Sequence, residues 1–198
     1  MGKVVWKGGT LLSPVPPVMV SCGDMENSNI ITIAWTGILN SNPPKTYISV
    51  RPQRHSFEII KNTKEFVINL TPASLVKEAD YCGVYTGAKV DKFEKCKFTK
   101  VPASTVGCPV IGECPMNLEC KVTDIVELGS HHMFIADITA INVDEELLDE
   151  KGKLRLDKAK LAAFAHGQYF ELGKKIGDFG FSVKKKKPSH GNKKGQRK

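Results

Sequence analysis

Residues 29–37 read NIITIAWTG, and the chain continues over residues 42–57 as NPPKTYISVRPQRHSF. Within the first stretch, residues 30–35 are apolar and rich in β-branched side chains, so they predict a buried strand. A Pro-Pro pair interrupts it, and residues 46–50 (TYISV) predict the next strand. Residues 55–60 then predict a short helix, because Ser56 is a candidate N-cap in front of a small apolar face.

The remaining hydrophobic runs are short and mostly of strand type. Strands are predicted over residues 14–21, 66–70, 118–128 and 133–143. A second helix is predicted over residues 75–85, and residues 161–172 fit either a helix or a looped segment. Short strands joined by turns, with two or three short helices, predict a mainly β protein built as an antiparallel barrel.

The composition indicates one domain with a tail. The 198 residues are 41% hydrophobic, which is enough for a single core over residues 1–183. Residues 184–198 hold eight Lys or Arg side chains and no acid, and they account for the net charge of +8. We expect this tail to be disordered and to bind nucleic acid weakly at most, and a solubilising role explains the same composition.

Six cysteines lie at positions 22, 82, 96, 108, 114 and 120, without a C-x-x-C pair. This spacing predicts no metal site and no disulfide framework, although Cys108 and Cys114, each before a proline, are a candidate redox pair. No run approaches the ~20 apolar residues of a membrane span, and residues 1–10 lack the apolar core of a signal peptide. We therefore expect a cytoplasmic protein with reduced thiols and no membrane contact.

Several stretches, taken in their order along the chain, resemble the flavin reductase-like family, which includes the flavoredoxins. They are residues 29–37 with the Asn-Pro-Pro at 42–44, residues 49–57, 86–93 and 118–137, and the shorter pieces 165–170 and 179–182. The G-x-G-x-x-G, P-loop and G-x-S-x-G motifs are absent. The resemblance implies a Greek-key-like, FMN-binding split β-barrel that pairs as a homodimer and carries FMN as its cofactor.

The resemblance places the FMN phosphate at the segment before the first predicted helix. This segment supplies hydroxyls and cations, from Ser49, Arg51, Arg54, His55 and Ser56. Arginine grips a phosphate through two parallel hydrogen bonds, and the N-terminus of a helix favours an anion. A later loop is implied to add Lys92 as a point charge, with Asp91 beside it.

The flavin ring is flat and apolar with polar atoms along its edge, so it needs a shaped cleft with a few convergent donors. The resemblance assigns this role to Ala34, Trp35 and Thr36, at the end of the first predicted strand. Trp35 also fits a core aromatic side chain that forms the wall of such a cleft. Tyr169 is implied to lie near the flavin or the dimer interface.

Residues 129–131 (Gly-Ser-His) indicate which kind of electron donor the protein uses. NAD(P)H-using members of the family carry Gly-Asp-His here, so Ser130 replaces an acid, and Ala136-Asp137 replaces Gly-Glu. These departures favour an electron carrier served by a ferredoxin-like protein. The alternative is an NAD(P)H-dependent flavin or ferric reductase with His131 as its candidate catalytic residue. A third possibility, a non-redox module that binds nucleic acid, rests only on the tail.

Overall fold

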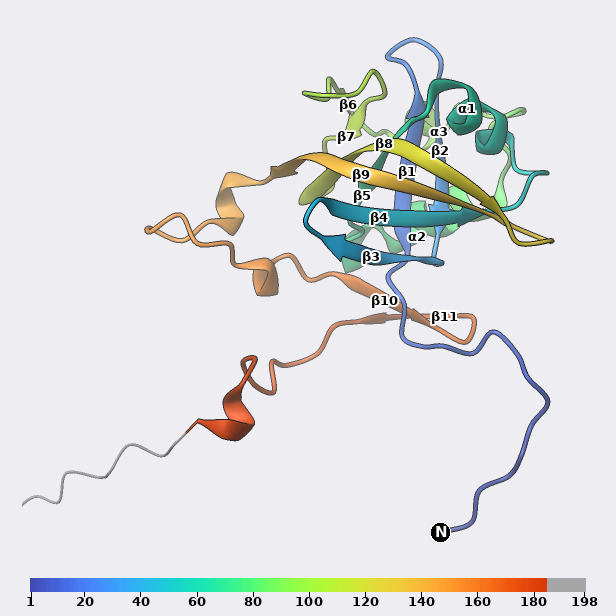
Figure 1. The fold of residues 1–198 in the computed structure, drawn as a ribbon. Helices are drawn as coiled ribbons and strands as arrows, with labels where there is room; N and C mark the ends of the chain where they lie inside the picture. The colour runs from blue at the N-terminus through green and yellow to red at the C-terminus, as the bar shows by residue number, and fades with distance from the viewer. Residues whose placement is uncertain (185–198) are drawn as a thin grey trace, which may run out of the picture.

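The computed structural model describes residues 1–184, and it confirms a mainly β fold with a few short helices (Figure 1). The main sheet holds β1 (Val18–Gly23), β2 (Ser28–Ile33), β3 (Thr36–Ser41), β4 (Pro44–Val50), β5 (Glu65–Asn69), β8 (Met116–Glu127) and β9 (His132–Val143). Two small sheets pair β6 (Lys100–Val101) with β7 (Val110–Ile111), and β10 (Ala162–Ala165) with β11 (Gln168–Glu171). The α-helices are α1 (His55–Thr63), α2 (Val76–Val84) and α3 (Lys92–Cys96). Single 3₁₀ turns lie at Ala73–Leu75, Glu145–Leu147, Leu156–Lys158 and Phe181–Val183.

The main sheet is antiparallel and runs in the order β2-β1-β5-β8-β9-β4-β3. Its two edge strands, β2 and β3, follow one another in the chain, so the sheet curls into a barrel with a seam between β2 and the β3–β4 hairpin. The Ser49 N–H donates to the carbonyl of Trp35, which directly precedes β3, at 3.0 Å, and this bond continues the pairing of β3 with β4. Among the described residues no strand pairing joins β2 to β3 or β4, so the barrel is split at this seam.

Helix α1 is anchored in the barrel core, which fixes where its N-terminus lies. Phe57 and Ile60 are buried among the inward side chains of β1, β2, β4, β5, β8 and β9. These two residues are one turn apart and so share a face of the helix. The Phe57 ring meets the Phe134 ring edge-on, with centroids 5.3 Å apart. This packing holds the first residues of α1 beside the open seam.

A second apolar layer covers the outer face of β1 and β2. Met19 and Ile30 point outward and pack against Ala79 and Cys82 of α2 and Phe93 of α3. Burial of such side chains is worth roughly 1.5–3 kcal/mol each. The layer brings the α2–α3 loop to the same end of β2 as the N-terminus of α1.

Two predicted elements were wrong in detail. Residues 161–172 form the β10–β11 hairpin rather than a helix or a loop, because His166 and Gly167 both have positive φ (48° and 81°), as a tight two-residue hairpin turn requires. The Pro-Pro pair does not simply end a strand, since it joins β4 to β3, a strand that sequence reasoning missed.

Residues 1–9 and 173–184 extend away from the barrel (Figure 1). Thr10, Leu12 and Val15 still line a cavity together with residues of the barrel. Among the described residues 1–184, none of the helices has the length and apolar character needed to cross a bilayer. The basic tail predicted over residues 184–198 lies outside the described residues except for Lys184. The predicted domain boundary at residue 183 therefore stays a prediction.

Candidate functional site

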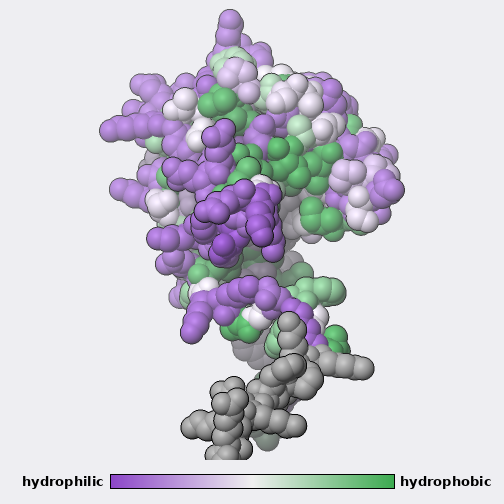
Figure 2. Space-filling model, turned by 90° about the vertical axis from the view of Figure 1, so that its left-hand side faces the viewer, coloured by the Kyte–Doolittle hydropathy of each residue, from purple (hydrophilic) through white to green (hydrophobic). Residues whose placement is uncertain are grey.

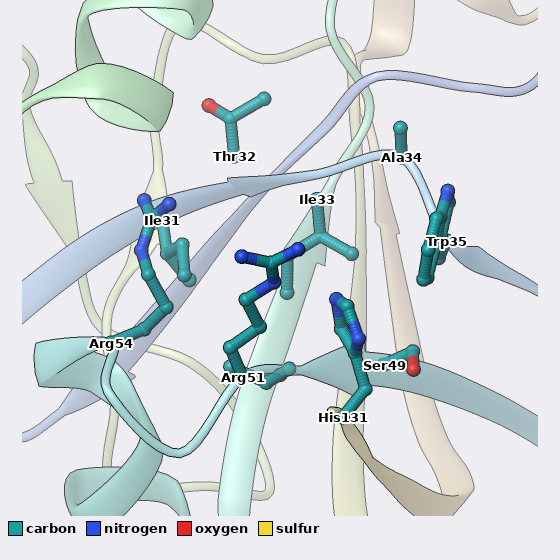
Figure 3. Close-up of a pocket in the computed structure, with 10 residues that line it drawn as sticks. Ile31, Thr32, Ile33, Ala34, Trp35, Ser49, Arg51, Arg54 and His131 are labelled. Atoms are coloured by element: carbon teal, nitrogen blue, oxygen red, sulfur yellow. The ribbon is translucent and has the colours of Figure 1, made fainter. Parts of the chain in front are cut away.

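A cleft of about 200 Å³ lies in the open seam, between β2 and the end of β4 (Figure 3). Its lining residues are Ile31, Thr32, Ile33, Ala34, Trp35, Ser49, Val50, Arg51, Arg54 and His131. Figure 3 shows the guanidinium groups of Arg51 and Arg54 toward one side and the rings of Trp35 and His131 toward the other. The cleft therefore has a cationic end and an aromatic end.

One wall of the cleft is the free edge of β2. In the main sheet β2 pairs only with β1, so its other edge faces the seam. A free strand edge presents unpaired N–H and C=O groups, which bind the polar edge of a ligand as a neighbouring strand would. Ile31 and Ile33 point into the barrel core, so their side chains offer no polar group to the cleft. Sequence reasoning missed both residues, because a period of two identifies the faces of a strand but not its free edge.

A smaller hollow adjoins the cationic end and shares Ile31 and Arg54 with the cleft. Its other lining residues are Asn29, His55, Ser56, Tyr85, Thr86, Gly87 and Lys92. Helix α1 begins here at His55, and the first backbone N–H groups of a helix have no partner within the helix. These groups, the positive end of the helix dipole and the nearby cations make the hollow suitable for an anion.

Both the backbone and the guanidinium group of Arg54 are held in place. It immediately precedes α1, and its Nη2 donates to the Gly83 carbonyl at 2.6 Å, which fixes the guanidinium between α1 and α2. Partial burial lowers the pKa of Arg54, and the neighbouring Arg51 lowers it further. An arginine keeps its charge at neutral pH nonetheless. An anion that binds between Arg51 and Arg54 reduces the repulsion between their two positive charges, so this pair favours a phosphate.

Ser56 lies at the hollow, but it is not the N-cap of α1. Arg54 occupies the N-cap position without a side-chain cap, and the buried Ser56 hydroxyl accepts a hydrogen bond from Asn29 Nδ2 at 2.8 Å. The apolar face of α1 packs into the barrel, and this packing sets where the helix begins. His55 lines the hollow as predicted.

Lys92 was predicted on a loop, but it is the buried first residue of α3. Its Nζ donates to the carbonyls of Ile30 at 2.6 Å and Cys82 at 2.8 Å, so it joins β2 to α2 behind the hollow. Burial is the main cause that lowers the pKa of Lys92 to about 8. Asp91 caps α3 by accepting a hydrogen bond from the Glu94 N–H at 3.1 Å, and it does not line the hollow.

Gly87 forms part of the wall of the hollow, and sequence reasoning did not select it. A Cβ atom at this position would lie 2.1 Å from Oδ1 of Asn29, so a larger residue would displace the Asn29 side chain. Asn29 in turn holds Ser56. The Thr-Gly pair at 86–87 was the available signal, since glycine allows one backbone to approach another group closely.

Trp35 and His131 form the aromatic end. Their ring centroids are 4.5 Å apart and the planes are tilted by 36°. Ser130 Oγ lies 2.9 Å from His131 Nδ1, on the turn between β8 and β9. Partial burial, followed by the charge of Arg51, lowers the pKa of His131, which favours the neutral imidazole. Trp35 is 41% exposed and therefore acts as a wall rather than as a core residue.

Thr36 and Tyr169 line neither the cleft nor the hollow, and the same holds for Asp91. Thr36 lines a neighbouring apolar cavity of about 320 Å³, and its hydroxyl donates to the Tyr47 carbonyl at 2.5 Å. Tyr169 lines a third cavity and donates to Asp80 Oδ1 at 3.1 Å. Burial, together with this bond to a carboxylate, raises the pKa of Tyr169 to about 12. Ala34 borders all three cavities, so both residues lie near the cleft without lining it.

The comparisons with known proteins match both the fold and the sequence. The family model of the flavin reductase like domain matches residues 11–173. The flavoredoxin of Desulfovibrio vulgaris (Miyazaki F) is 32% identical, with a TM-score of 0.84 over 92% of this chain and 99% of that chain. Flavoredoxin from Methanosarcina acetivorans is 26% identical, with a TM-score of 0.82 over 90% and 95%. An FMN-binding protein from Thermus thermophilus is 22% identical and shares the fold, with a TM-score of 0.76 over 90% and 99%.

Proposed function

Because this chain belongs to the flavin reductase-like family, we propose that it binds one FMN in the seam of the barrel and moves electrons through it. One observation carries the proposal: a cleft with a free strand edge and two arginines, Arg51 and Arg54, adjoins a hollow at a helix N-terminus, and Arg54 lines both. The two ends of FMN match these two parts of the site, because one end is a flat ring with a polar edge and the other end is a phosphate. Flavin supplies the electron chemistry when bound, and the protein binds and orients it.

The chain's own residues divide into two groups under this proposal. Arg54, Arg51 and the first N–H groups of α1 hold the phosphate. The free edge of β2 from Ile31 to Ile33 binds the polar edge of the ring, and Trp35 limits access of water at the far end. Lys92 acts indirectly, since its two carbonyl bonds position β2 and α2 around the hollow.

We favour an electron carrier of the flavoredoxin type over an NAD(P)H-dependent reductase. Ser130 stands where NAD(P)H-using members carry an acid, and its hydroxyl is occupied by the His131 ring. That ring lies against Trp35 over the aromatic end, where a nicotinamide would have to approach. The donor we propose is a ferredoxin-like protein, and the cytoplasm, with its reduced thiols, is the proposed location because all six cysteines are free.

A flavin titration followed by rapid mixing tests this function. We expect added FMN to lose its fluorescence on binding, with one FMN per chain, and we expect dithionite to bleach the bound flavin fully. Mixing with NADH or NADPH should bleach it only slowly. Well-folded protein that binds no FMN would refute the flavin proposal. Bleaching by NADH or NADPH within milliseconds would refute only the carrier and would establish the reductase alternative.

We also propose that the chain pairs as a homodimer through its extended ends. Trp6, Ile176 and Phe179 are 73%, 95% and 107% exposed, and they lie on segments that leave the barrel. Figure 2 shows hydrophobic side chains along the narrow lower part of the molecule as well as on the rounded body. Exposed apolar surface of this kind marks an interface, and twofold pairing is the commonest way to cover it.

Light scattering on the purified full chain tests the pairing. We expect a particle of twice the chain mass, and deletion of residues 1–12 should shift it toward the monomer because the N-terminal apolar side chains are lost. The substitution Lys3→Gln is the matched control, since it changes an exposed residue of the same segment without removing apolar surface. A full chain that stays monomeric at every concentration would contradict this proposal.

A further inference from the structure

Two cysteine thiols face each other beside the hollow. Cys82 on α2 and Cys96 at the end of α3 have their Sγ atoms 3.8 Å apart. Cys82 is buried, as are the four cysteines outside this pair, whereas Cys96 is partly exposed. An oxidant dissolved in water therefore reaches Cys96 first and finds Cys82 as the thiol next to it.

We propose that Cys82 and Cys96 are a disulfide-forming pair that hydrogen peroxide closes in two steps. In the first step the Cys96 sulfur takes one oxygen atom from the peroxide, which gives a sulfenic acid and one water. In the second step the Cys82 sulfur attacks the Cys96 sulfur and the hydroxyl group leaves, taking up the thiol proton as a second water. In total the two thiols lose two electrons and two protons, and one peroxide is reduced to two waters.

The surrounding contacts favour this pairing. Lys92, on the same helix as Cys96, donates to the Cys82 carbonyl at 2.8 Å, so the two helices are already tied together next to the thiols. A disulfide needs its sulfurs about 2.05 Å apart, and the present separation leaves less than 2 Å to close. The candidate pair from sequence reasoning, Cys108 and Cys114, is buried in two different apolar clusters and is not brought together.

The surroundings of the two thiols predict how fast the disulfide between Cys82 and Cys96 forms. Burial raises the pKa of both thiols above the usual cysteine range. Only the thiolate is a good nucleophile, so oxidation should be slow in neutral buffer and faster in mildly alkaline buffer. The segment between the two cysteines includes Tyr85, Thr86 and Gly87 of the hollow. A cross-link restricts this segment in the unfolded chain, so oxidation should raise the melting temperature by several degrees.

Peroxide treatment of the full chain, with no flavin added, tests the proposal independently of the proposed function. Remaining thiols are alkylated, and the protein is then digested and analysed by mass spectrometry. We expect four alkylated cysteines and one cross-linked species that joins the Cys82 and Cys96 peptides and disappears on reduction. The Cys96→Ser variant should lose this species and the rise in melting temperature. The Cys114→Ala variant, changed in the same apolar cluster, should keep both.

Circular dichroism confirms that each variant is folded before oxidation. A cross-link between Cys96 and a different cysteine would overturn the proposal. Conversion of Cys96 to its sulfinic acid without any cross-link to Cys82 would overturn it as well.

Discussion

Replacing Arg54 by alanine is expected to raise the dissociation constant for FMN by roughly 10- to 100-fold. A charge-assisted hydrogen bond contributes about 1.5–3 kcal/mol, and each 1.4 kcal/mol is a factor of about ten in affinity. Arg54 is rigid before the ligand arrives, because the Gly83 carbonyl holds its guanidinium, so little side-chain entropy is lost on binding. A fluorescence titration with FMN measures the change.

Riboflavin separates loss of the phosphate contact from damage to the fold. It has the same ring as FMN but no phosphate, so its affinity should be the same in the Arg54→Ala variant and the unaltered protein. Arg155→Ala is the matched control, because Arg155 is a partly exposed arginine that pairs with Asp157 and lines neither the cleft nor the hollow. Equal losses for riboflavin and FMN would show that Arg54 does not bind the phosphate.

Much of the barrel was predictable because its strands alternate or are continuously apolar over short runs. The strand over 46–50, the helix at 55–60 and the two long strands before and after residues 129–131 were all found in this way, and the structure confirms them. The seam was not predictable from periodicity. Which strand lies at an edge depends on pairings between distant residues, such as β4 with β9, and a local pattern does not contain them.

The site was predicted in part, from the resemblance of several stretches of the sequence to the flavin reductase-like family. Ala34, Trp35, Ser49, Arg51, Arg54 and His131 line one cleft, because two of its walls are continuous pieces of chain, residues 31–35 and 49–54. Lys92 was expected to be a free point charge, but a charge signal in the sequence does not tell whether a lysine is buried. Here the carbonyls of Ile30 and Cys82 occupy its ammonium group. Tyr169 lies near the cleft without lining it, because its hairpin packs beside Asp80 of α2, a contact between residues far apart in the chain.

Replacing Glu119 by alanine is expected to lower the free energy of unfolding by about 3 kcal/mol or more. Glu119 is fully buried on β8 and organises a loop that has no regular structure of its own. Its carboxylate accepts the N–H groups of Ser104 at 2.8 Å and Thr105 at 2.6 Å, the Thr105 hydroxyl at 2.6 Å and Asn142 Nδ2 at 2.8 Å. Alanine leaves these donors without a partner and leaves a cavity, and for a chain of this length the melting temperature should fall by about 6–12 °C.

Glu113 provides the matched control for burial. Its carboxylate also accepts the N–H and the hydroxyl of one threonine, Thr99, at 3.0 and 2.7 Å, but it does so in solvent. Water replaces such bonds when they are lost, so Glu113→Ala should cost less than about 1 kcal/mol. Equal losses of stability in the two variants would show that burial of the network is not what matters.

The pH dependence of unfolding isolates the charge of Glu119. Burial by itself would raise the pKa of Glu119, but the hydrogen bonds from residues 104, 105 and 142 outweigh it and lower the pKa to about 2. The folded chain therefore binds this proton less readily than the unfolded chain does, whose glutamate has a pKa near 4.5. The resulting stability, roughly 3 kcal/mol, is complete above pH 4.5 and is lost as the pH falls through 2. Glu119→Gln removes this titration, so denaturant melts should show the unaltered protein losing more stability than the variant between neutral and acidic pH. Parallel profiles would mean that the carboxylate is not held as a charged acceptor.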